Sequence, residues 1–423
     1  MLKKRSLMAC LCVLWGALAA GEEKVELVEA KELRARDGLP NVLAKLEKGG
    51  KVKVGYLGGS ITAAAGWRVQ TREWLAKKFP QAEVSEINAA IGGTGSGLGA
   101  FRVGEHVLKH GPDLLFVEFA VNDGGTQPAS ILRSMEGIVR QTWRANPETD
   151  ICFVYTLTDK MVGDVQKGKF PRAASTMEAV AGHYGIPSIH MGLEVVKLME
   201  EGNLVFKSED KKADEAAGKI VFSTDGVHPL TESGHPLYTA AVTASLEKLA
   251  GVGEPGPHQL GEPLTADNME NARLIPITEA MLEGAWEKGG KLEQRFSSRV
   301  PSLWQAKEPG AKLKLIFKGS ALSCYDLVGP DGGVLKVTVD GVEKTPVKRI
   351  DGYCTYHRLA SFSVLNDPEG GVHEVTIELT GEKLEKREIL FESKRAEFDK
   401  NPERYAGHTW YLGGLLAIGE LEE

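Results

Sequence analysis

The sequence predicts an α/β domain built on a parallel β-sheet, followed by an antiparallel β-sandwich. In residues 51 to about 250, short apolar runs alternate with longer segments of helical spacing. Strands joined by helical crossovers form parallel sheets covered by helices on both faces. Beyond that segment, short alternating runs are separated by Gly, Pro and Asp, a pattern typical of antiparallel sandwiches. The chain of 423 residues also exceeds one ordinary core, so two domains are expected.

In the first half, five apolar runs are expected to form the parallel strands. These strands are expected at residues 51–57, 84–91, 113–121, 151–157 and 186–191. Helices are expected between them at 67–79, 98–110 and 129–143. Sheets of this kind carry their active sites at the carboxyl ends of the strands, so the residues directly after each run are the informative ones.

In the second half, turn signals separate the expected strands. The strands are expected at 312–317, 334–339, 360–365 and 374–379, with turns at 330–333 and 340–341. Residues 208–212 are highly charged and predict a solvated insertion, and residues 251–257 have linker composition. We therefore expect a first domain at 21–250 and an accessory domain at 258–423.

The N-terminus has the pattern of a secretory signal peptide. Lys3, Lys4 and Arg5 precede an apolar run at 7–18 that ends in a small-x-small cleavage pattern. That run falls short of the ~20 residues that a spanning helix needs, and no later segment is apolar enough, so no stable membrane insertion is expected. We predict that residues 1–20 are a signal peptide and that the protein is secreted or periplasmic. The net charge of -7 gives no basic surface for nucleic acid.

Three cysteines remain after the predicted signal peptide, which is not a disulfide framework. Cys152 lies in an apolar run and is expected to pack as a small hydrophobic residue. Export would place Cys324 and Cys354 in an oxidising compartment, where a disulfide can form. The sequence does not show whether the two cysteines pair.

Polar residues with catalytic potential follow the apolar runs in order. Ser60 follows the first run, Gly93 the second and Asn122 the third, while Asp225 stands three residues before His228. Each has an ordinary structural explanation: a helix N-cap for the serine, turns for the glycine and asparagine, and a capping acid beside a surface histidine. Any one of these residues could occur by chance. Chance explains much less readily why all of them occur together and in this order.

Serine, glycine, asparagine and histidine in this order, each in its own block, resemble the SGNH (GDSL-like) hydrolases over roughly residues 51–250. The resemblance implies a flavodoxin-like, three-layer fold in which Ser60 is the nucleophile, His228 its base and Asp225 the residue that orients the histidine. It further implies an oxyanion hole formed by the backbone N–H groups of Ser60 and Gly93 and the side chain of Asn122. The activity implied is that of a metal-independent serine esterase without a cofactor.

The chain departs from the family pattern at two positions. The serine block usually reads Gly-Asp-Ser, whereas Gly59 stands here before the serine, and Ala120 replaces the usual glycine of the asparagine block. Two other enzyme classes fit less well. Residues 95–100 resemble a dinucleotide-binding fingerprint, but they follow the second strand and leave the serine and histidine unexplained. The nucleophile elbow of α/β-hydrolases ends in glycine, where this chain has Thr62.

The substrate is expected to be an acylated carbohydrate or another small ester, with acetyl as the acyl group, by analogy with carbohydrate esterases that remove acetyl groups from polysaccharides. A polar and aromatic cluster in the second half suggests sugar binding, with the alternative that it forms sandwich core and domain interface. The cluster comprises Asp351, Tyr353, Tyr356, His357 and Arg358, with Trp410 and Tyr411 near the end. The other function considered is a secreted, non-catalytic glycan-binding protein with a degenerate hydrolase domain.

Overall fold

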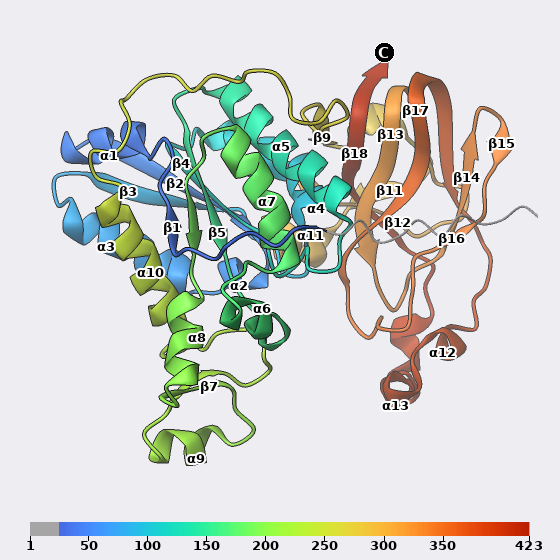
Figure 1. Ribbon diagram of the computed structural model, residues 1–423. Coiled ribbons are helices and arrows are strands. Elements are labelled where there is room, and N and C mark those ends of the chain that lie inside the picture. Colours follow the sequence, from blue (N-terminus) through green and yellow to red (C-terminus); the bar gives the residue numbers. More distant parts are fainter. Residues whose placement is uncertain (1–24, 423) are drawn as a thin grey trace, which may run out of the picture.

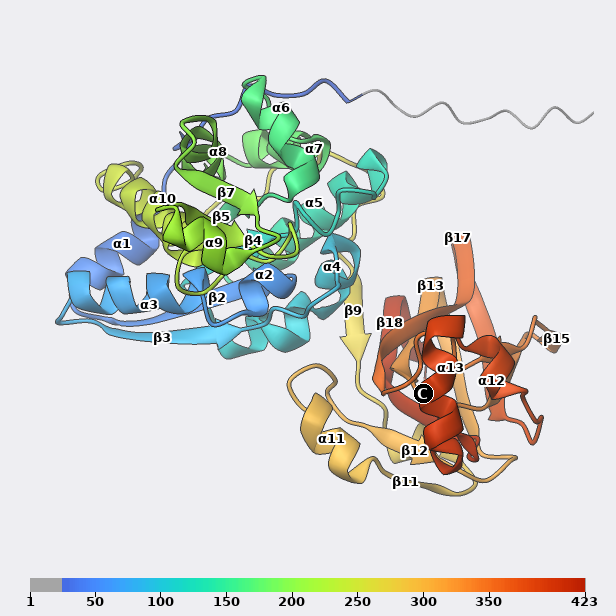
Figure 2. The same cartoon turned by 90° about the horizontal axis from the view of Figure 1, so that it is seen from below.

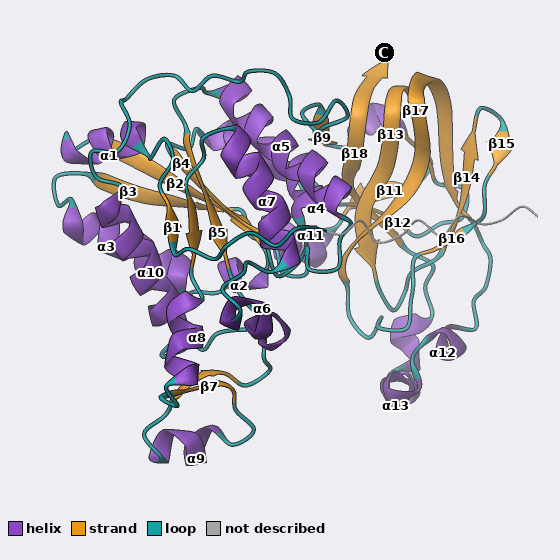
Figure 3. Ribbon diagram, viewed as in Figure 1, coloured by secondary structure: helices purple, strands orange, loops and turns teal. Residues whose placement is uncertain are grey.

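The computed structural model describes residues 25–422. The predicted signal peptide lies outside the described residues and stays a prediction. Among the described helices, none is long and apolar enough to cross a membrane. A layered α/β domain and a mostly β domain lie side by side, the first blue to green and the second orange to red in Figure 1. Figure 3 shows the helices in purple and the strands in orange.

The first domain is built on a six-stranded sheet with the order β1-β6-β5-β4-β2-β3. The edge strand β1 is antiparallel to β6, and the other neighbours are parallel. Strands β4 and β5 are buried along their whole length, because helices cover both faces of a parallel sheet. The strands are β1 (Leu33–Arg34), β2 (Lys51–Gly58), β3 (Glu83–Asn88), β4 (Leu114–Glu118), β5 (Asp150–Tyr155) and β6 (Ser188–His190).

Two helical layers enclose this sheet. Successive side chains of a strand point to opposite faces, so that Val54 and Tyr56 of β2 join one core cluster and Leu57 joins the other. Full burial of each large apolar side chain contributes about 1.5–3 kcal/mol, which makes these two clusters the main source of stability. One layer comprises α1 (Pro40–Glu47), α3 (Trp67–Lys78) and α10 (Gly234–Lys248), and the other α4 (Ser96–His106), α5 (Pro128–Ala145) and α7 (Arg172–His183).

The strand order places a topological switch beside β2. The chain passes from β2 to β3 on one side and then crosses to β4 on the other side of β2. In open parallel sheets, ligands bind in the crevice outside the carboxyl ends of the strands at such a switch. The loops that follow β2, β3 and β4 therefore open into one space.

The charged segment predicted as an insertion forms a small subdomain of its own. Its strands pair in parallel, and the rings of Phe206 and Phe222 pack with centroids 4.7 Å apart. The side chain of Asp210 caps the helix between them by accepting a hydrogen bond of 3.1 Å from the Ala213 N–H. The subdomain comprises α8 (Leu193–Glu200), β7 (Leu204–Lys207), α9 (Lys211–Ala216) and β8 (Ile220–Ser223). Strand β8 leads directly to the segment that contains Asp225 and His228.

Residues 251–257, which have linker composition, are held against the first domain. Gly256 exchanges hydrogen bonds of 2.8 and 2.9 Å with the side chain of Asn41. The next residue but one, His258, stacks on Trp143 at 4.7 Å between ring centroids. The chain thus runs back over the α/β layers before it enters the second domain.

The second domain is a ten-stranded antiparallel sheet, which confirms the predicted antiparallel architecture. The turn expected at 340–341 joins β14 to β15, and both of its residues adopt left-handed conformations, with φ of 52° at Asp340 and 75° at Gly341. Such a turn matches the twist of the strands it connects. The strands are β9 (Ala272–Ile275), β10 (Leu282–Glu283), β11 (Trp286–Lys288), β12 (Trp304–Ala306), β13 (Lys312–Val328), β14 (Val334–Val339), β15 (Val342–Glu343), β16 (Val347–Lys348), β17 (Arg358–Leu379) and β18 (Trp410–Glu422).

Three of the strands predicted for this domain are parts of longer ones. The strand expected at 312–317 continues through β13, and those at 360–365 and 374–379 both lie in β17. The pairing of β13 with β17 shifts register between Gly319 and Ala321 and resumes on both sides. The Gly- and Pro-rich sequence of β17 opposite this point therefore forms a bulge rather than a strand end.

The pairing of Cys324 with Cys354, which the sequence left open, is not formed. All three cysteines of the described chain are buried free thiols, and these two lie in separate core clusters. Cys152 packs in the core of the first domain as predicted.

Helix α4 joins the two domains. Its Ala100 and Val103 pack into the core of the first domain, whereas Leu98 and Phe101 pack against a cluster of the second domain that includes Tyr325. Because α4 directly follows the loop that contains Gly93, the second domain lies behind that loop. Figure 2, seen from below, shows α4 between the α/β layers and the β domain. The remaining helices are α2 (Ser60–Ala63), α6 (Val162–Gln166), α11 (Gly290–Phe296), α12 (Lys386–Ile389) and α13 (Glu392–Lys400), and the 3-10 turns are η1 (Leu108–His110), η2 (Asp159–Met161), η3 (Glu279–Met281) and η4 (Pro402–Tyr405).

Candidate active site

The three loops at the switch point bring the predicted nucleophile to the edge of the sheet. Ser60 is the first residue of α2, directly after β2 and the N-cap residue Gly59. At this position the backbone N–H has no partner inside the helix, because the first turn of a helix leaves its N–H groups free. The serine hydroxyl and its own N–H therefore both face the crevice.

The structure brings Ser60, His228 and Asp225 into one hydrogen-bonded chain. The distance from Ser60 Oγ to His228 Nε2 is 2.8 Å, and that from His228 Nδ1 to Asp225 Oδ2 is 2.6 Å. Because a carboxylate only accepts hydrogen bonds, Nδ1 carries the proton and donates it to Asp225, which leaves Nε2 to accept from the serine hydroxyl. About half of each of the His228 and Asp225 side chains is exposed, so the relay opens to solvent.

The loop around Asp225 keeps its carboxyl ionised. Burial alone would raise its pKa, but hydrogen bonds from the His228 ring and from the N–H groups of His228 and Val227 outweigh this effect. The hydroxyl of Ser223 adds a further bond of 3.0 Å, and the pKa of Asp225 lies well below its usual range. The carboxylate is thus fixed in place and charged before any reaction begins.

The predicted oxyanion-hole residues lie on the neighbouring loops. Gly93 has a φ of 75°, a left-handed conformation that favours glycine. Within the described residues, no protein group accepts a hydrogen bond from the Gly93 N–H or the Asn122 side chain. The Asn122 side chain lies against Gly59, where an added Cβ would come within 2.0 Å of its Oδ1. Two unused donors thus flank the serine.

Two buried acids that the sequence analysis missed hold these loops. Asp123 accepts hydrogen bonds of 3.1 and 3.3 Å from the Ser96 N–H at the start of α4, and burial raises its pKa. Glu118, at the end of β4, accepts bonds from Thr62 of α2 at 2.9 Å and from Thr156 at 2.6 Å. Burial also raises the pKa of Glu118. Glu118 is an acid inside the most apolar run of the chain. This pattern could have identified it from the sequence, because acids are rarely buried without partners.

The buried Asp123 also excludes the dinucleotide-binding alternative. Its carboxylate occupies the N-terminus of α4, where such a fingerprint would place a pyrophosphate. Two negative groups would repel each other at this helix end. A second histidine near the relay is likewise excluded as the base: burial lowers the pKa of His235 to about 4, and its Nδ1 accepts the Trp67 N–H at 3.1 Å.

The predicted sugar-binding cluster divides into an exposed part and a buried part. Asp351 forms an ion pair with Arg358, beside the ring of Tyr353, which is 56% exposed. His357 instead bonds to Asp331 at 2.8 Å, and Tyr411 donates to the same carboxylate at 2.6 Å. Trp410 is fully buried and Tyr356 is exposed. No hydrogen bond or ion pair among the described residues joins this cluster to Ser60, and its function stays a prediction.

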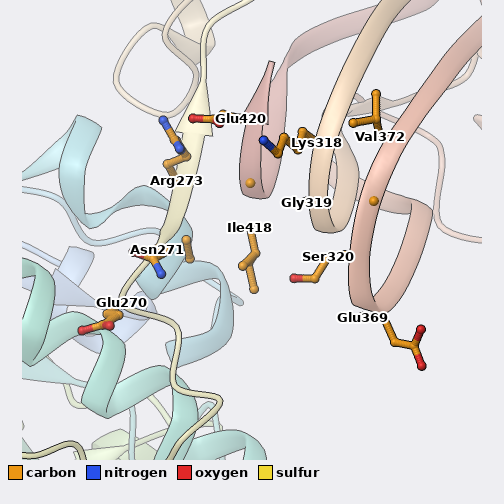
Figure 4. Close-up of a pocket in the computed structure, with 14 residues that line it drawn as sticks. Glu270, Asn271, Arg273, Lys318, Gly319, Ser320, Glu369, Val372, Ile418 and Glu420 are labelled. Atoms are coloured by element: carbon orange, nitrogen blue, oxygen red, sulfur yellow. The ribbon is translucent and has the colours of Figure 1, made fainter. Parts of the chain in front are cut away.

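A groove lies elsewhere, along the seam between the domains. It has a volume of about 730 Å³ and is lined by β9, β13, β17 and β18 (Figure 4). Its side chains are of mixed charge, with Arg273 and Lys318 beside Glu420. None of the relay residues lines it, so its size alone does not make it the reaction site.

Potential metal ligands are not grouped in the described part of the chain. No set of three or more His, Cys, Asp or Glu side chains is arranged there to hold an ion.

Comparisons with known proteins agree with this fold. Residues 56–235 match the model of the GDSL-like lipase/acylhydrolase family. A two-domain esterase (CEX) active on acetylated mannans, crystallised with mannopentaose, superposes with a TM-score of 0.69 at 22% identity, over 92% of this chain and 97% of that one. A second crystal structure of a two-domain esterase (CEX) active on acetylated mannans gives 0.68 at 21% identity over the same shares. No curated protein sequence matches the chain. The matched segment spans the serine, glycine, asparagine and histidine blocks and is similar to the GDSL-like lipase/acylhydrolase family, and the fold of both domains is shared with the two-domain esterases.

Proposed function

We propose that this protein is a serine esterase that removes a small acyl group, an acetyl, from a carbohydrate through an acyl-enzyme. The observation that carries the proposal is the relay from Ser60 through His228 to Asp225, with distances of 2.8 and 2.6 Å. An alcohol is a weak nucleophile at neutral pH and needs an adjacent base, and a base works best when a third group orients it.

In the first half of the proposed reaction, Ser60 Oγ attacks the ester carbonyl and its proton passes to His228 Nε2. Asp225 stabilises the imidazolium that forms. The carbonyl oxygen becomes an oxyanion, which accepts hydrogen bonds from the N–H groups of Ser60 and Gly93 and from the Asn122 amide. Each such donor contributes about 3 kcal/mol to lowering the barrier. The tetrahedral intermediate then expels the sugar hydroxyl, which takes the proton back from His228.

In the second half, water replaces the sugar. His228 removes a proton from the water, whose oxygen attacks the acyl carbon, and the same three donors hold the second oxyanion. Collapse of this intermediate breaks the bond to Ser60 Oγ and returns the proton to the serine. Acetate leaves, and the enzyme is restored without any other reactant.

The carbohydrate part of the proposal is supported by the second domain. The two-domain esterase whose fold is shared over both domains is described as active on acetylated mannans. In this chain, the exposed ring of Tyr353 packs edge to face on Phe391 at 4.6 Å, next to the Asp351–Arg358 ion pair. Aromatic faces beside fixed polar groups suit sugar rings. Export, through the predicted signal peptide, would bring the enzyme to polysaccharides outside the cell.

The glycine at position 59 does not favour the alternative function, a non-catalytic glycan-binding protein with a degenerate hydrolase domain. Its replacement of the usual aspartate suggested a degenerate hydrolase, but the Asn122 side chain lies where a Cβ at this position would be. Glycine is therefore the residue that fits beside the asparagine. The experiment that tests the proposal is a measurement of acetate released from acetylated mannan, xylan and pectin and from acetylated sialosides. Absence of release from all of them and from small acetate esters would refute it.

Activity is expected to survive exhaustive chelation. The nucleophile, the base and the oxyanion donors of the proposed reaction all come from Ser60, His228, Gly93 and Asn122, so no step requires an ion. The rate of acetate-ester hydrolysis should be measured before and after dialysis against a chelator. A loss of activity that zinc restores would show metal-assisted hydrolysis instead.

Tyr353→Ala is expected to weaken hydrolysis of an acetylated polysaccharide without affecting a small acetate ester. Contacts remote from the reacting bond are made only by a large substrate. Loss of one aromatic contact of about 1.4 kcal/mol corresponds to about a tenfold fall in kcat/KM. Val372→Ala, which removes another exposed side chain of the same domain, serves as the control. An equal fall on both substrates would show that Tyr353 has a role in folding.

A further inference from the structure

Arg102, in the middle of α4, differs from the other buried arginines of the described chain. Four arginines in that part are buried, and three of them pair with a carboxylate. Arg68 pairs with Glu86, Arg140 with Glu270 and Arg349 with Asp326. Arg102 is 0% exposed, yet no ion pair among the described residues includes it.

The guanidinium of Arg102 bonds instead to the two loops of the proposed oxyanion hole. It donates to the carbonyl oxygen of Ala89, directly after β3, and at 3.3 Å to that of Gly58, two residues before the nucleophile. A longer contact of 3.5 Å reaches the hydroxyl of Thr94, next to Gly93. One rigid planar group thus connects the loop that contains Ser60 to the loop that contains Gly93.

Burying a charge in this way is costly. An unpaired cation loses its hydration in the interior, and backbone carbonyl dipoles replace it only in part. The Nε of Arg102 has no acceptor among residues 25–422. Burial lowers the pKa of Arg102 to about 10, which still leaves it charged at neutral pH. A hydrophobic side chain would fill this place more stably, so stability alone does not explain an arginine here.

The position of the charge behind the oxyanion hole explains why an arginine stands here. We infer that Arg102 is a positioning residue for the oxyanion hole: it fixes the distance between the Ser60 and Gly93 backbone donors and adds a positive charge behind them. A developing oxyanion in a site of low dielectric gains from both effects. The inference rests on the proposed esterase function.

The second domain takes part in this arrangement. Tyr325 belongs to the cluster against which α4 packs, it is 1% exposed, and its hydroxyl has no partner among the described residues. The nearby positive charge of Arg102 opposes the effect of burial on the pKa of Tyr325. Through α4, the β domain thus seals the arginine from water on the side away from the reaction.

The test uses Arg102→Met, which keeps an unbranched apolar stem but removes the guanidinium with its charge and donors. The full-length variant is compared on an oxygen ester and on the matching thionoester, whose sulfur accepts hydrogen bonds poorly and gains little from an oxyanion hole. Displacing the backbone donors should lower kcat for the oxygen ester about 100-fold, with KM little changed. The ratio of kcat/KM for the oxygen ester to that for the thionoester should fall by a similar factor.

A purely structural role would leave that ratio unchanged, because a smaller fraction of folded enzyme lowers both rates equally. Arg140→Met is the matched control: Arg140 is buried and bonds to the carbonyl oxygens of Leu260 and Gly261, and we expect it to lower the Tm but not the ratio. If Arg102→Met does not fold, Arg102→Lys, which keeps the charge but loses the planar fork, provides the same measurement. It should also lower the ratio.

The outcomes separate the two proposals. If the unmodified enzyme hydrolyses neither ester, the proposed function itself is wrong. Suppose instead that the unmodified enzyme and Arg140→Met hydrolyse both esters. If the Arg102 variants then have the same ratio of oxygen-ester to thionoester kcat/KM as the unmodified enzyme, only the inference about Arg102 is overturned.

Discussion

Ser60→Ala should abolish ester hydrolysis, with a fall in kcat of at least about 10⁴-fold, while the protein stays folded. The reason is that the hydroxyl forms the acyl-enzyme, and no other group near His228 Nε2 replaces it. Among the residues that the structure describes, the hydroxyl is bonded only to His228, at the open edge of the sheet, so its removal leaves no buried group without a partner. The measurement is acetate release from a small ester, with the Tm as the check on folding.

Two controls make this result specific. Ser85→Ala removes a hydroxyl from β3 whose only bond is a weak one of 3.4 Å to the Val52 carbonyl, and it should keep full activity. A serine-directed phosphonate should label the unmodified enzyme at Ser60 and should fail to label Ser60→Ala. Near-normal turnover by Ser60→Ala would mean that the reaction does not pass through an acyl-serine.

The fold was predictable wherever local pattern and tertiary environment agree. The run that became β4 is apolar up to Glu118, because both faces of its strand are covered, and its type and place followed directly from the sequence. The pattern failed at β17, where a Gly- and Pro-rich segment separated two predicted strands that in fact belong to one. Pairing with β13 on both sides of that segment makes it a bulge, and long-range pairing of this kind leaves no local signal. For the same reason, the linker composition of 251–257 did not reveal its bonds to Asn41.

The residues of the candidate site that line the crevice could be predicted from the sequence. Ser60, Asn122 and His228 stand in the segments that follow β2, β4 and β8, where polar residues are conspicuous. The residues that hold them are different. Glu118 and Arg102 lie within a strand and a helix, and each acts through a backbone segment distant in sequence. Their polar character inside apolar or helical segments was visible, but their partners depend on the register of the folded chain.

Gly59→Ala should inactivate the enzyme although it touches no atom of the relay. Gly59 has φ of -92° and ψ of -154°, an extended conformation open to alanine, so the backbone itself does not resist the change. The new Cβ would meet Asn122 Oδ1 at 2.0 Å. The end of a side chain moves more readily than a sheet, so we expect Asn122 to turn away and the oxyanion hole to lose one donor. The expected fall in kcat is about 10²–10³-fold, with little change in Tm.

A double-mutant cycle tests whether Gly59 acts through Asn122. Asn122→Ala should lower kcat by a similar factor, and the double variant should be no worse than Asn122→Ala, because the donor displaced by the first change is already absent. Gly97→Ala, in the first turn of α4 where an added Cβ meets nothing within 4 Å, is the matched control and should keep full activity. If the two losses multiply in the double variant, the methyl group disturbs Ser60 itself. In that case, contact with Asn122 would not explain why this chain has Gly59 where the family usually has aspartate.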